Sequence, residues 1–126
     1  MPLPTNAVSE DALSDDYRPG EHRAMRIDAV APIEVGPGCL RRDLAGHDGV
    51  RVWVVDMAPG SAWPQVDHHD RGESYFVASG ELIEGDRRYP AGTHVWFAPG
   101  SHHRPRTELG ARLYGLNPAA AGAAGT

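Results

Sequence analysis

The sequence predicts an all-β fold, a small antiparallel jelly roll or barrel. The chain of 126 residues contains 15 glycines and 11 prolines, the residue types that punctuate tight turns. Val, Trp and Tyr are concentrated between residues 50 and 116, and such β-branched and aromatic residues favour strands. Many short strands joined by tight turns are typical of jelly rolls and small barrels, and the length suits one domain with a buried core.

Nine strands are expected where apolar residues alternate between turns. Their ranges are 25–29, 39–43, 50–57, 62–67, 74–79, 81–84, 87–89, 94–98 and 111–116. The turns between them contain Gly, Pro or Asp, as in Ala58-Pro59-Gly60, Gly85-Asp86 and Pro99-Gly100-Ser101. Strands this short and closely spaced favour a jelly roll or barrel over an open sheet.

The two ends of the chain differ from its centre. Residues 1–23 mix prolines with acidic residues and have few large apolar side chains, which predicts a flexible arm with one short helix around 11–16. Residues 118–126 are mostly Ala and Gly and predict a disordered tail. A single folded domain is therefore expected at 24–117.

Charge and cysteine content limit the classes of partner. The net charge is −5, and no basic run exceeds Arg41-Arg42 or Arg87-Arg88, which argues against nucleic acid. The single cysteine, Cys39, excludes an intrachain disulfide. No apolar run is long enough for a signal peptide or a membrane span. We expect a cytoplasmic protein with a small-molecule partner and no membrane association.

Histidines and a glutamate recur with the spacing of metal ligands. His68-His69 precedes Glu73 by four or five residues, and a third histidine follows the turn at 99–101, in His102-His103. Two imidazoles and a carboxylate on neighbouring strands are a common ligand set for one divalent metal. Exposed histidine pairs of this kind can also be solvated loops.

These motifs resemble those of the cupin superfamily over residues 30–117. Gly60, Glu73 and Gly80 match the first cupin motif, and the segment 99–103 is similar to the Pro-Gly-Ser-x-His form of the second motif in ChrR-type cupin domains. The resemblance implies a cupin-type antiparallel jelly-roll β-barrel, one bound divalent metal and a homodimer. A metal-free structural cupin is an alternative.

The first histidine of the cupin motif is missing, so two strand registers compete. Side chains on a strand alternate, so either Asp67 and His69 point inward together or Val66 and His68 do. The second register leaves only three ligands and places a valine against the metal. We prefer the first register, which gives the ligand set Asp67, His69, Glu73 and His103.

Other residues are expected to line the pocket. Tyr75 shares strand parity with Glu73 and is the candidate catalytic residue, a hydrogen-bond donor near the metal; it could equally be a core aromatic. Trp53 and Arg51 share one face of the strand at 50–57. Arg104 and Arg106 either bind an anionic substrate at the mouth or are solvated.

The ligand set and the resemblance together predict a metal-dependent enzyme acting on a small molecule in the barrel. Histidine and carboxylate ligands suit Fe, Mn, Ni or Zn. The reaction could be that of an oxygenase, an isomerase or cyclase, or other Lewis-acid chemistry, including a step in a biosynthetic pathway. The alternative is a module that senses or binds a metal or ligand without catalysis.

Overall fold

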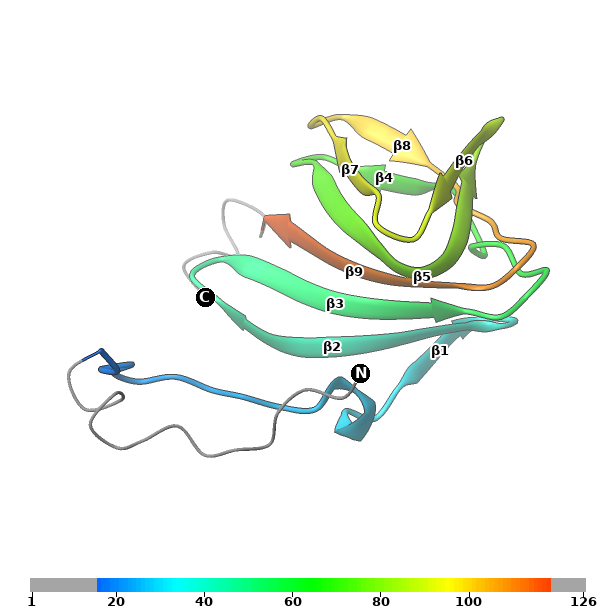
Figure 1. Cartoon of the computed structure of the whole chain (residues 1–126). Coiled ribbons are helices and arrows are strands. Elements are labelled where there is room, and N and C mark those ends of the chain that lie inside the picture. Colours follow the sequence, from blue (N-terminus) through cyan, green and yellow to red (C-terminus); the bar gives the residue numbers. More distant parts are fainter. Residues whose placement is uncertain (1–15, 119–126) are drawn as a thin grey trace.

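The computed structural model describes residues 16–118 and is built almost entirely of strands (Figure 1). One short 3-10 helix, Ile27–Ala29, precedes them. The strands are β1 (Ile33–Gly36), β2 (Cys39–His47), β3 (Val50–Met57), β4 (Asp67–His69), β5 (Glu73–Glu84), β6 (Arg87–Pro90), β7 (His94–Phe97), β8 (Ser101–His103) and β9 (Ala111–Pro118).

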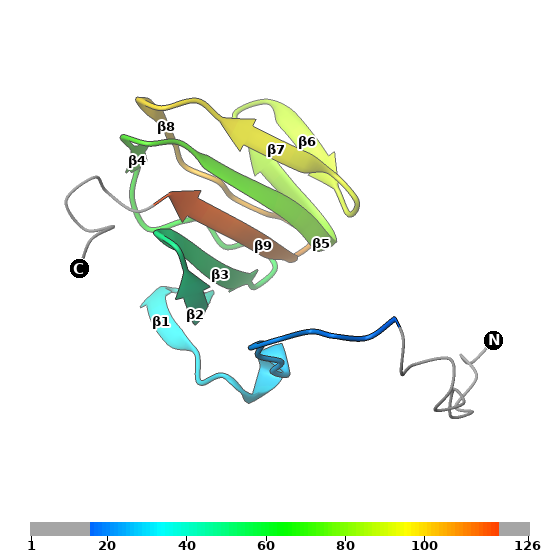
Figure 2. The same cartoon turned by 90° about the vertical axis from the view of Figure 1, so that its left-hand side faces the viewer.

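The strands form two antiparallel sheets. The larger has the order β1-β2-β3-β9-β5-β6, with β7 also paired to β5. It curves strongly, and β4 and β8 form a separate two-stranded ribbon that lies above its concave face in Figure 1 and at one end of the strands in Figure 2. This is the predicted all-β, antiparallel jelly-roll arrangement.

The core lies on the concave face of the larger sheet. Alternation along three neighbouring strands places the buried side chains there: Trp53, Val55 and Met57 on β3, Tyr75 and Val77 on β5, and Ala111 and Leu113 on β9. Burial of one large apolar side chain stabilises the fold by roughly 1.5–3 kcal/mol. Cys39 belongs to the same cluster and is fully buried, so it packs rather than reacts.

Most expected strands are present, and the differences have physical reasons. The strand predicted at 25–29 is wrong: a 3-10 helix occupies this segment, with the Ala29 N–H donating to the Arg26 carbonyl at 3.0 Å. The strand predicted at 62–67 is also wrong, because only Ala62 makes a β-bridge, to Arg106, and β4 begins at the end of the predicted range. Pro64 interrupts this segment and has no N–H to donate.

Other boundaries also differ from the expectations. The predicted strands 74–79 and 81–84 are one strand, β5, which pairs with β9 over residues 74–80, with a register shift between Val77 and Ser79, and with β6 over residues 81–84. Strands β1 and β8 were not expected. Most of the predicted arm (1–23), the short helix around 11–16 and nearly all of the predicted tail (118–126) lie outside the described residues. Within residues 16–118, no helix has the length and apolar character needed to cross a bilayer.

Candidate metal centre

The ribbon β4–β8 brings two segments of the chain together at one site. Asp67 on β4 is the direct cross-strand partner of His103 on β8, and His69 is paired with Ser101. Asp67, His69 and His103 share one face of the ribbon, because residues two apart on a strand and directly opposed residues point to the same side. Three of the predicted ligands therefore come from a pair of very short strands.

Glu73 reaches the same site through a tight turn. Gly72 adopts a φ of 87°, and its N–H donates to the His69 carbonyl at 3.2 Å. A Cβ atom at this position would lie 2.7 Å from the Phe97 carbonyl oxygen, so both the conformation and the space require glycine. The turn places Glu73, the first residue of β5, below the ribbon and 7% exposed.

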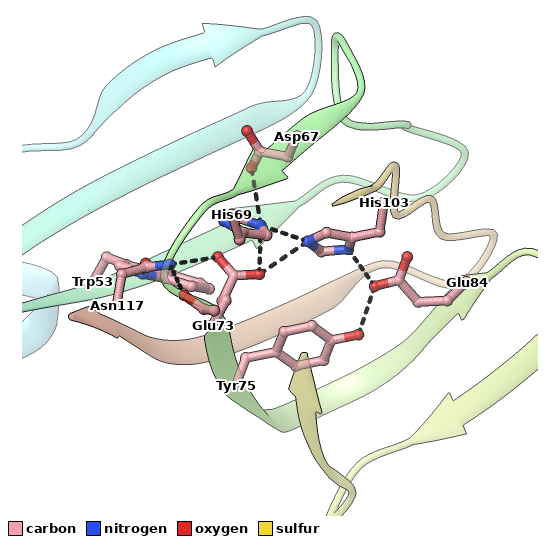
Figure 3. Close-up of polar contacts among 9 residues, drawn as sticks. Trp53, Asp67, His69, Glu73, Tyr75, Glu84, His103 and Asn117 are labelled. Carbon is pink, nitrogen blue, oxygen red and sulfur yellow. Dashed lines mark hydrogen bonds and ion pairs between the residues drawn. The ribbon is translucent and has the colours of Figure 1, made fainter. Parts of the chain in front are cut away.

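Three atoms of the candidate ligands form a nearly equilateral triangle (Figure 3). His69 Nε2 lies 2.8 Å from His103 Nε2 and 3.1 Å from Glu73 Oε2, and His103 Nε2 lies 2.9 Å from the same Glu73 oxygen. The fourth predicted ligand is more distant, with Asp67 Oδ2 at 3.8 Å from His69 Nε2. One donor atom from each of the four residues lies within 4.8 Å of the others.

These spacings fit the ligand shell of one divalent cation. Two ligand atoms about 2.1 Å from a metal and at right angles to each other are about 3.0 Å apart. The triangle therefore has the dimensions of one face of an octahedron, with Asp67 able to supply a fourth ligand. The donor set of two imidazoles and two carboxylates suits Fe, Mn, Ni or Zn.

Glu84 fixes the orientation and tautomer of His103. Its Oε2 atom accepts hydrogen bonds from His103 Nδ1 and from the Tyr75 hydroxyl, each at 2.7 Å. With the proton of Nδ1 directed at Glu84, Nε2 is the nitrogen that faces the other ligands. Phe97 stacks on the imidazole with ring centroids 4.2 Å apart and holds its plane.

Electrostatics at His103 favour a cation at this point. Burial alone would lower the pKa of its imidazole, but the hydrogen bonds to Glu73 and Glu84 and their negative charges outweigh burial and raise the pKa to about 9. The pKa of the Tyr75 phenol is also raised, because of burial and the charge of Glu84. Tyr75 therefore keeps its proton and acts as a donor.

A second pair of side chains holds Glu73. The Trp53 indole N–H donates to Asn117 Oδ1, and because the indole can only donate, the Asn117 amide group turns its NH₂ towards Glu73. Asn117 Nδ2 donates to Glu73 Oε1 at 3.2 Å. One carboxylate oxygen is thereby bound to β9, and the other, Oε2, is left for the two histidines.

The ribbon has the first of the two registers considered from the sequence. Val66 is 47% exposed, and His68 and His102 are exposed cross-strand neighbours with ring centroids 5.6 Å apart. Their partners in sequence, His69 and His103, are the histidines of the triangle. The adjacent histidines are thus divided between the two faces of one ribbon.

A cavity of about 440 Å³ opens beside these ligands. All four predicted ligands and Tyr75 line it. Its other walls combine apolar side chains, from Val35, Trp53, Val55, Trp63 and Leu113, with polar ones, from Arg41, Arg51, Gln65, His68 and Asn117. Arg104 and Arg106 do not line it: Arg104 Nε donates to the Trp63 carbonyl at 2.7 Å, and Arg106 lies 3.8 Å from Glu108. The arrangement suits a small molecule with one end at the ligand cluster.

A model of the ChrR cupin-like domain matches residues 21–118, which is most of the chain. The chain belongs to the ChrR cupin-like domain family. No curated protein was matched by sequence. The family assignment confirms the cupin resemblance and covers both the curved sheet and the ribbon.

Solved structures with the same fold show low sequence identity to this ChrR cupin-like chain. An RmlC-like cupin from Shewanella frigidimarina is 18% identical, with a TM-score of 0.67 over 81% of this chain and 94% of that one. A polyketide cyclase from Streptomyces resistomycificus is 15% identical, with a TM-score of 0.66 over 79% and 81%. An acetylacetone dioxygenase from Acinetobacter johnsonii is 13% identical, with a TM-score of 0.63 over 82% and 80%.

Several residues of the site were not identified as such from the sequence. Glu84 and Asn117 are far along the chain from the ligands they contact, and no local motif marks them. Arg41 also lines the cavity. For Trp53 and Arg51, strand parity gave a partial signal, since both lie on the face of β3 that lines the cavity.

Proposed function

We propose that this protein is a metal-dependent cupin enzyme that acts on a small molecule in the cavity beside the ligand cluster. The observation that carries the proposal is the triangle of His69, Glu73 and His103, whose ligand atoms lie 2.8–3.1 Å apart at the wall of that cavity. Asp67 is the proposed fourth ligand. The catalytic unit is the single domain at 24–117.

The bound ion would supply Lewis-acid chemistry, polarising a substrate oxygen or activating a small co-substrate. The chain's own residues do the rest. Glu84 and Phe97 hold His103 in one orientation, and Asn117 holds Glu73. The apolar walls from Trp53, with its neighbours on β3 and β9, exclude water from a bound molecule.

Tyr75 is proposed to act as a protonated hydrogen-bond donor at the cavity wall. Its ring lines the cavity, while its hydroxyl donates to Glu84 at 2.7 Å. The raised pKa of the phenol makes it unsuitable as a general base near neutral pH. Its contribution is therefore to position Glu84 and, through Glu84, His103, with its ring in contact with the substrate.

The reaction class that we propose is oxygenation, isomerisation, cyclisation or related Lewis-acid chemistry. Structures that share the fold carry the names of a dioxygenase and a cyclase. At identities this low the likeness concerns the fold, so it supports the range of enzyme kinds rather than one of them. A second candidate is a sensing or binding module without catalysis. It is favoured by the hydrogen bond from the Tyr75 hydroxyl to Glu84, because a hydroxyl that donates to Glu84 does not donate to a substrate.

The test of the metal proposal uses the two faces of the ribbon. We expect His69→Ala, Glu73→Gln and His103→Ala to lose most of the metal after reconstitution, because each removes one of the close ligands. His68→Ala and His102→Ala are matched controls on the same strands and should retain it. Metal content is measured on untagged protein by elemental analysis. Retention of metal by His69→Ala together with loss by His68→Ala would reject the ligand set.

The Asp67→Ala variant tests whether the metal site has four protein ligands or three. Asp67 is the most exposed and most distant member of the set, with a side chain 36% exposed and its Oδ2 3.8 Å from His69 Nε2. If Asp67 is a ligand, its removal should weaken metal binding by at least about tenfold. Unchanged affinity would leave a three-residue site with more open positions.

We also propose that the protein is a homodimer and that the outer face of the larger sheet carries the contact. Four large apolar side chains are exposed there, Phe76 on β5, Trp96 on β7, and Tyr114 and Leu116 on β9. Phe76 is directly opposite Tyr114, and Ser74 is flanked by Leu116 and Trp96. Contiguous exposed apolar side chains of this kind are typical of protein interfaces.

A further inference from the structure

Two arginines are among the residues that line the cavity. Arg41 comes from β2 and Arg51 from β3, and both share the inward face with Trp53 and Val55. Arg41 is directly opposite Val55, and Arg51 lies two residues before Trp53, so the indole lies between the two guanidinium-bearing positions. Arg41 is partly buried and Arg51 is exposed at the cavity, so water can solvate the Arg51 guanidinium when no ligand is bound.

The described residues satisfy these arginines only in part. Arg41 Nη2 donates to Asp43 at 3.2 Å, but Arg41 Nε, although 3.0 Å from the other Asp43 oxygen, is buried and makes no hydrogen bond. Within residues 16–118, Arg51 makes neither an ion pair nor a side-chain hydrogen bond. The cavity therefore offers guanidinium donors that the described residues do not use, and one guanidinium group can bind a carboxylate through two hydrogen bonds.

The position of Arg51 links this pair to the ligand cluster. Arg51 is the direct cross-strand partner of Asn117, and Asn117 donates to Glu73 at 3.2 Å. A molecule bound to Arg51 would therefore have one end close to Asn117, which itself contacts the candidate ligand Glu73. Its remaining atoms would lie against Trp53 and the apolar wall beside it.

The charges of the cavity favour an anion as well. Arg41 is already paired with Asp43, whereas Arg51 has no carboxylate partner among residues 16–118. A divalent cation at the candidate ligands would offset the charges of Asp67 and Glu73 and leave Arg51 as the cavity's unpaired positive charge among the described residues. A neutral substrate could contact the apolar walls but would form no ion pair with Arg51.

We propose that Arg41 and Arg51 form an anion subsite for the substrate, which is a small organic acid with an apolar or aromatic body. This inference rests on the proposed function and names the substrate class of that same cavity. The carboxylate, or another planar oxyanion, is bound by the two guanidinium groups. The apolar body packs on Trp53 and extends towards His69 and Glu73.

Benzoate and benzamide are the probes, since they differ in charge and share size and shape. Titrations of the full chain are followed by NMR shifts, both with metal and without it. We expect benzoate to bind at least about tenfold more tightly than benzamide in both states, because charge-assisted bidentate hydrogen bonds are formed only with the anion. Equal binding of the two probes would overturn the proposal.

Arginine variants identify the groups responsible. Arg51→Gln should weaken benzoate binding by about tenfold and leave benzamide unchanged, and Arg51→Lys should recover part of the loss, since lysine keeps the charge but not the planar fork. Arg104→Gln is the matched control outside the cavity and should bind benzoate like the natural protein. Arg41→Gln should resemble Arg51→Gln.

The design keeps the two proposals apart. Both arginine variants should retain full metal content, and circular dichroism checks that they remain folded. Failure of the chain to bind metal would refute the proposed function, while the preference for benzoate in the metal-free protein decides the subsite independently. Unchanged benzoate affinity in Arg51→Gln and Arg41→Gln would show that the carboxylate binds elsewhere.

Discussion

Glu84 affects the candidate centre although its carboxylate contacts Nδ1 of His103 rather than the triangle of candidate ligand atoms. Its carboxylate joins His103 and Tyr75 through two hydrogen bonds of 2.7 Å, and its side chain is only 10% exposed. A charged acceptor on Nδ1 makes the opposite nitrogen a stronger metal ligand and keeps the ring in place. Loss of the Glu84 charge should therefore weaken the binding of a metal by Nε2 of His103.

Glu84→Gln is accordingly expected to lower metal affinity by about 10- to 100-fold while the fold is retained, because outer partners of ligating histidines have effects of this size. The measurement is competition with a chromogenic chelator. Glu81→Gln is the control, since Glu81 lies on the same strand and pairs with exposed Arg88 instead. An affinity equal to that of the natural protein would mean that Glu84 only packs against the ring.

Metal binding should also be coupled to the release of a proton from His103. Its pKa of about 9 means that the metal-free protein carries a proton there at pH 7, which a metal ion must displace. Apparent affinity should rise between pH 7 and about 9 and then level off. Calorimetry in buffers of different ionisation enthalpy should find close to one proton released at pH 7.5. Proton release that is already zero at pH 7 would contradict the raised pKa.

The same shift affects the stability of the metal-free protein. A histidine whose pKa in the folded protein lies above its ordinary value of 6.5 contributes its full stabilisation of the fold below pH 6.5. The contribution is lost as the pH rises through about 9. Metal-free protein should therefore melt at a lower temperature at pH 9.5 than at pH 6.5, and metal should reduce the difference.

At the residue scale the sequence identified the four residues that come together in the candidate centre, but not the residues that support them. Strand alternation distinguishes His69 from His68, because a one-residue shift exchanges the two faces. Glu84 could not be found in this way, since its contact with His103 depends on the bend of β5 and on a ribbon formed by another part of the chain. Asn117 is likewise brought to Glu73 only by pairing of β9 with its neighbours.

At the element scale, β9 is adapted to the indole of Trp53. Gly115 is the cross-strand partner of Trp53, and a Cβ atom there would collide with the six-membered part of the ring. The ring therefore lies over the backbone of β9 and reaches Asn117. Glycine in a strand usually weakens it, and here it makes room for a close approach.

Gly115→Ala should consequently destabilise the protein by about 1–3 kcal/mol, as overpacking of a core commonly does. It should also displace Trp53, loosen Asn117 and reduce metal affinity. Denaturant unfolding and tryptophan fluorescence measure the two effects. Trp53→Leu on the Gly115→Ala background removes the collision, so the two substitutions should be less than additive. Strict additivity would show that the ring and residue 115 do not compete for space.

The elements predicted correctly are those with long alternating patterns and clear turns, such as β3, whose bounds match the expected range 50–57. The segment 25–29 has the same alternation, but a pattern cannot reveal whether a neighbouring strand exists to accept its hydrogen bonds. It forms a 3-10 helix outside the sheet. Strands of three residues, such as β4 and β8, are too short to show any period, and only their mutual pairing defines them.

At the scale of the whole molecule, the two faces of the larger sheet have different roles. The concave face carries the core, the cavity and the candidate ligand Glu73 of β5, while the opposite face exposes a row of apolar side chains on β5, β7 and β9. Trp96 is 66% exposed, which leaves much of a large aromatic ring system in contact with water. A monomer of 13.6 kDa has little core relative to its surface, so association through this face would add buried apolar area.

A charge on this face should therefore separate the proposed dimer. The natural protein is expected to have a mass of about 27 kDa by light scattering, twice the chain mass of 13.6 kDa. Trp96→Glu and Phe76→Glu should shift it towards the monomer, because burying an unpaired charge in the contact would cost several kcal/mol. Leu109→Glu is the control, since Leu109 is also exposed (68%) but lies in the segment between β8 and β9.

A mass of 13.6 kDa for the natural protein at millimolar concentration would refute the dimer. Metal content should stay the same in all three variants, because the four proposed ligands lie on the ribbon and at the start of β5 and face the cavity rather than this surface.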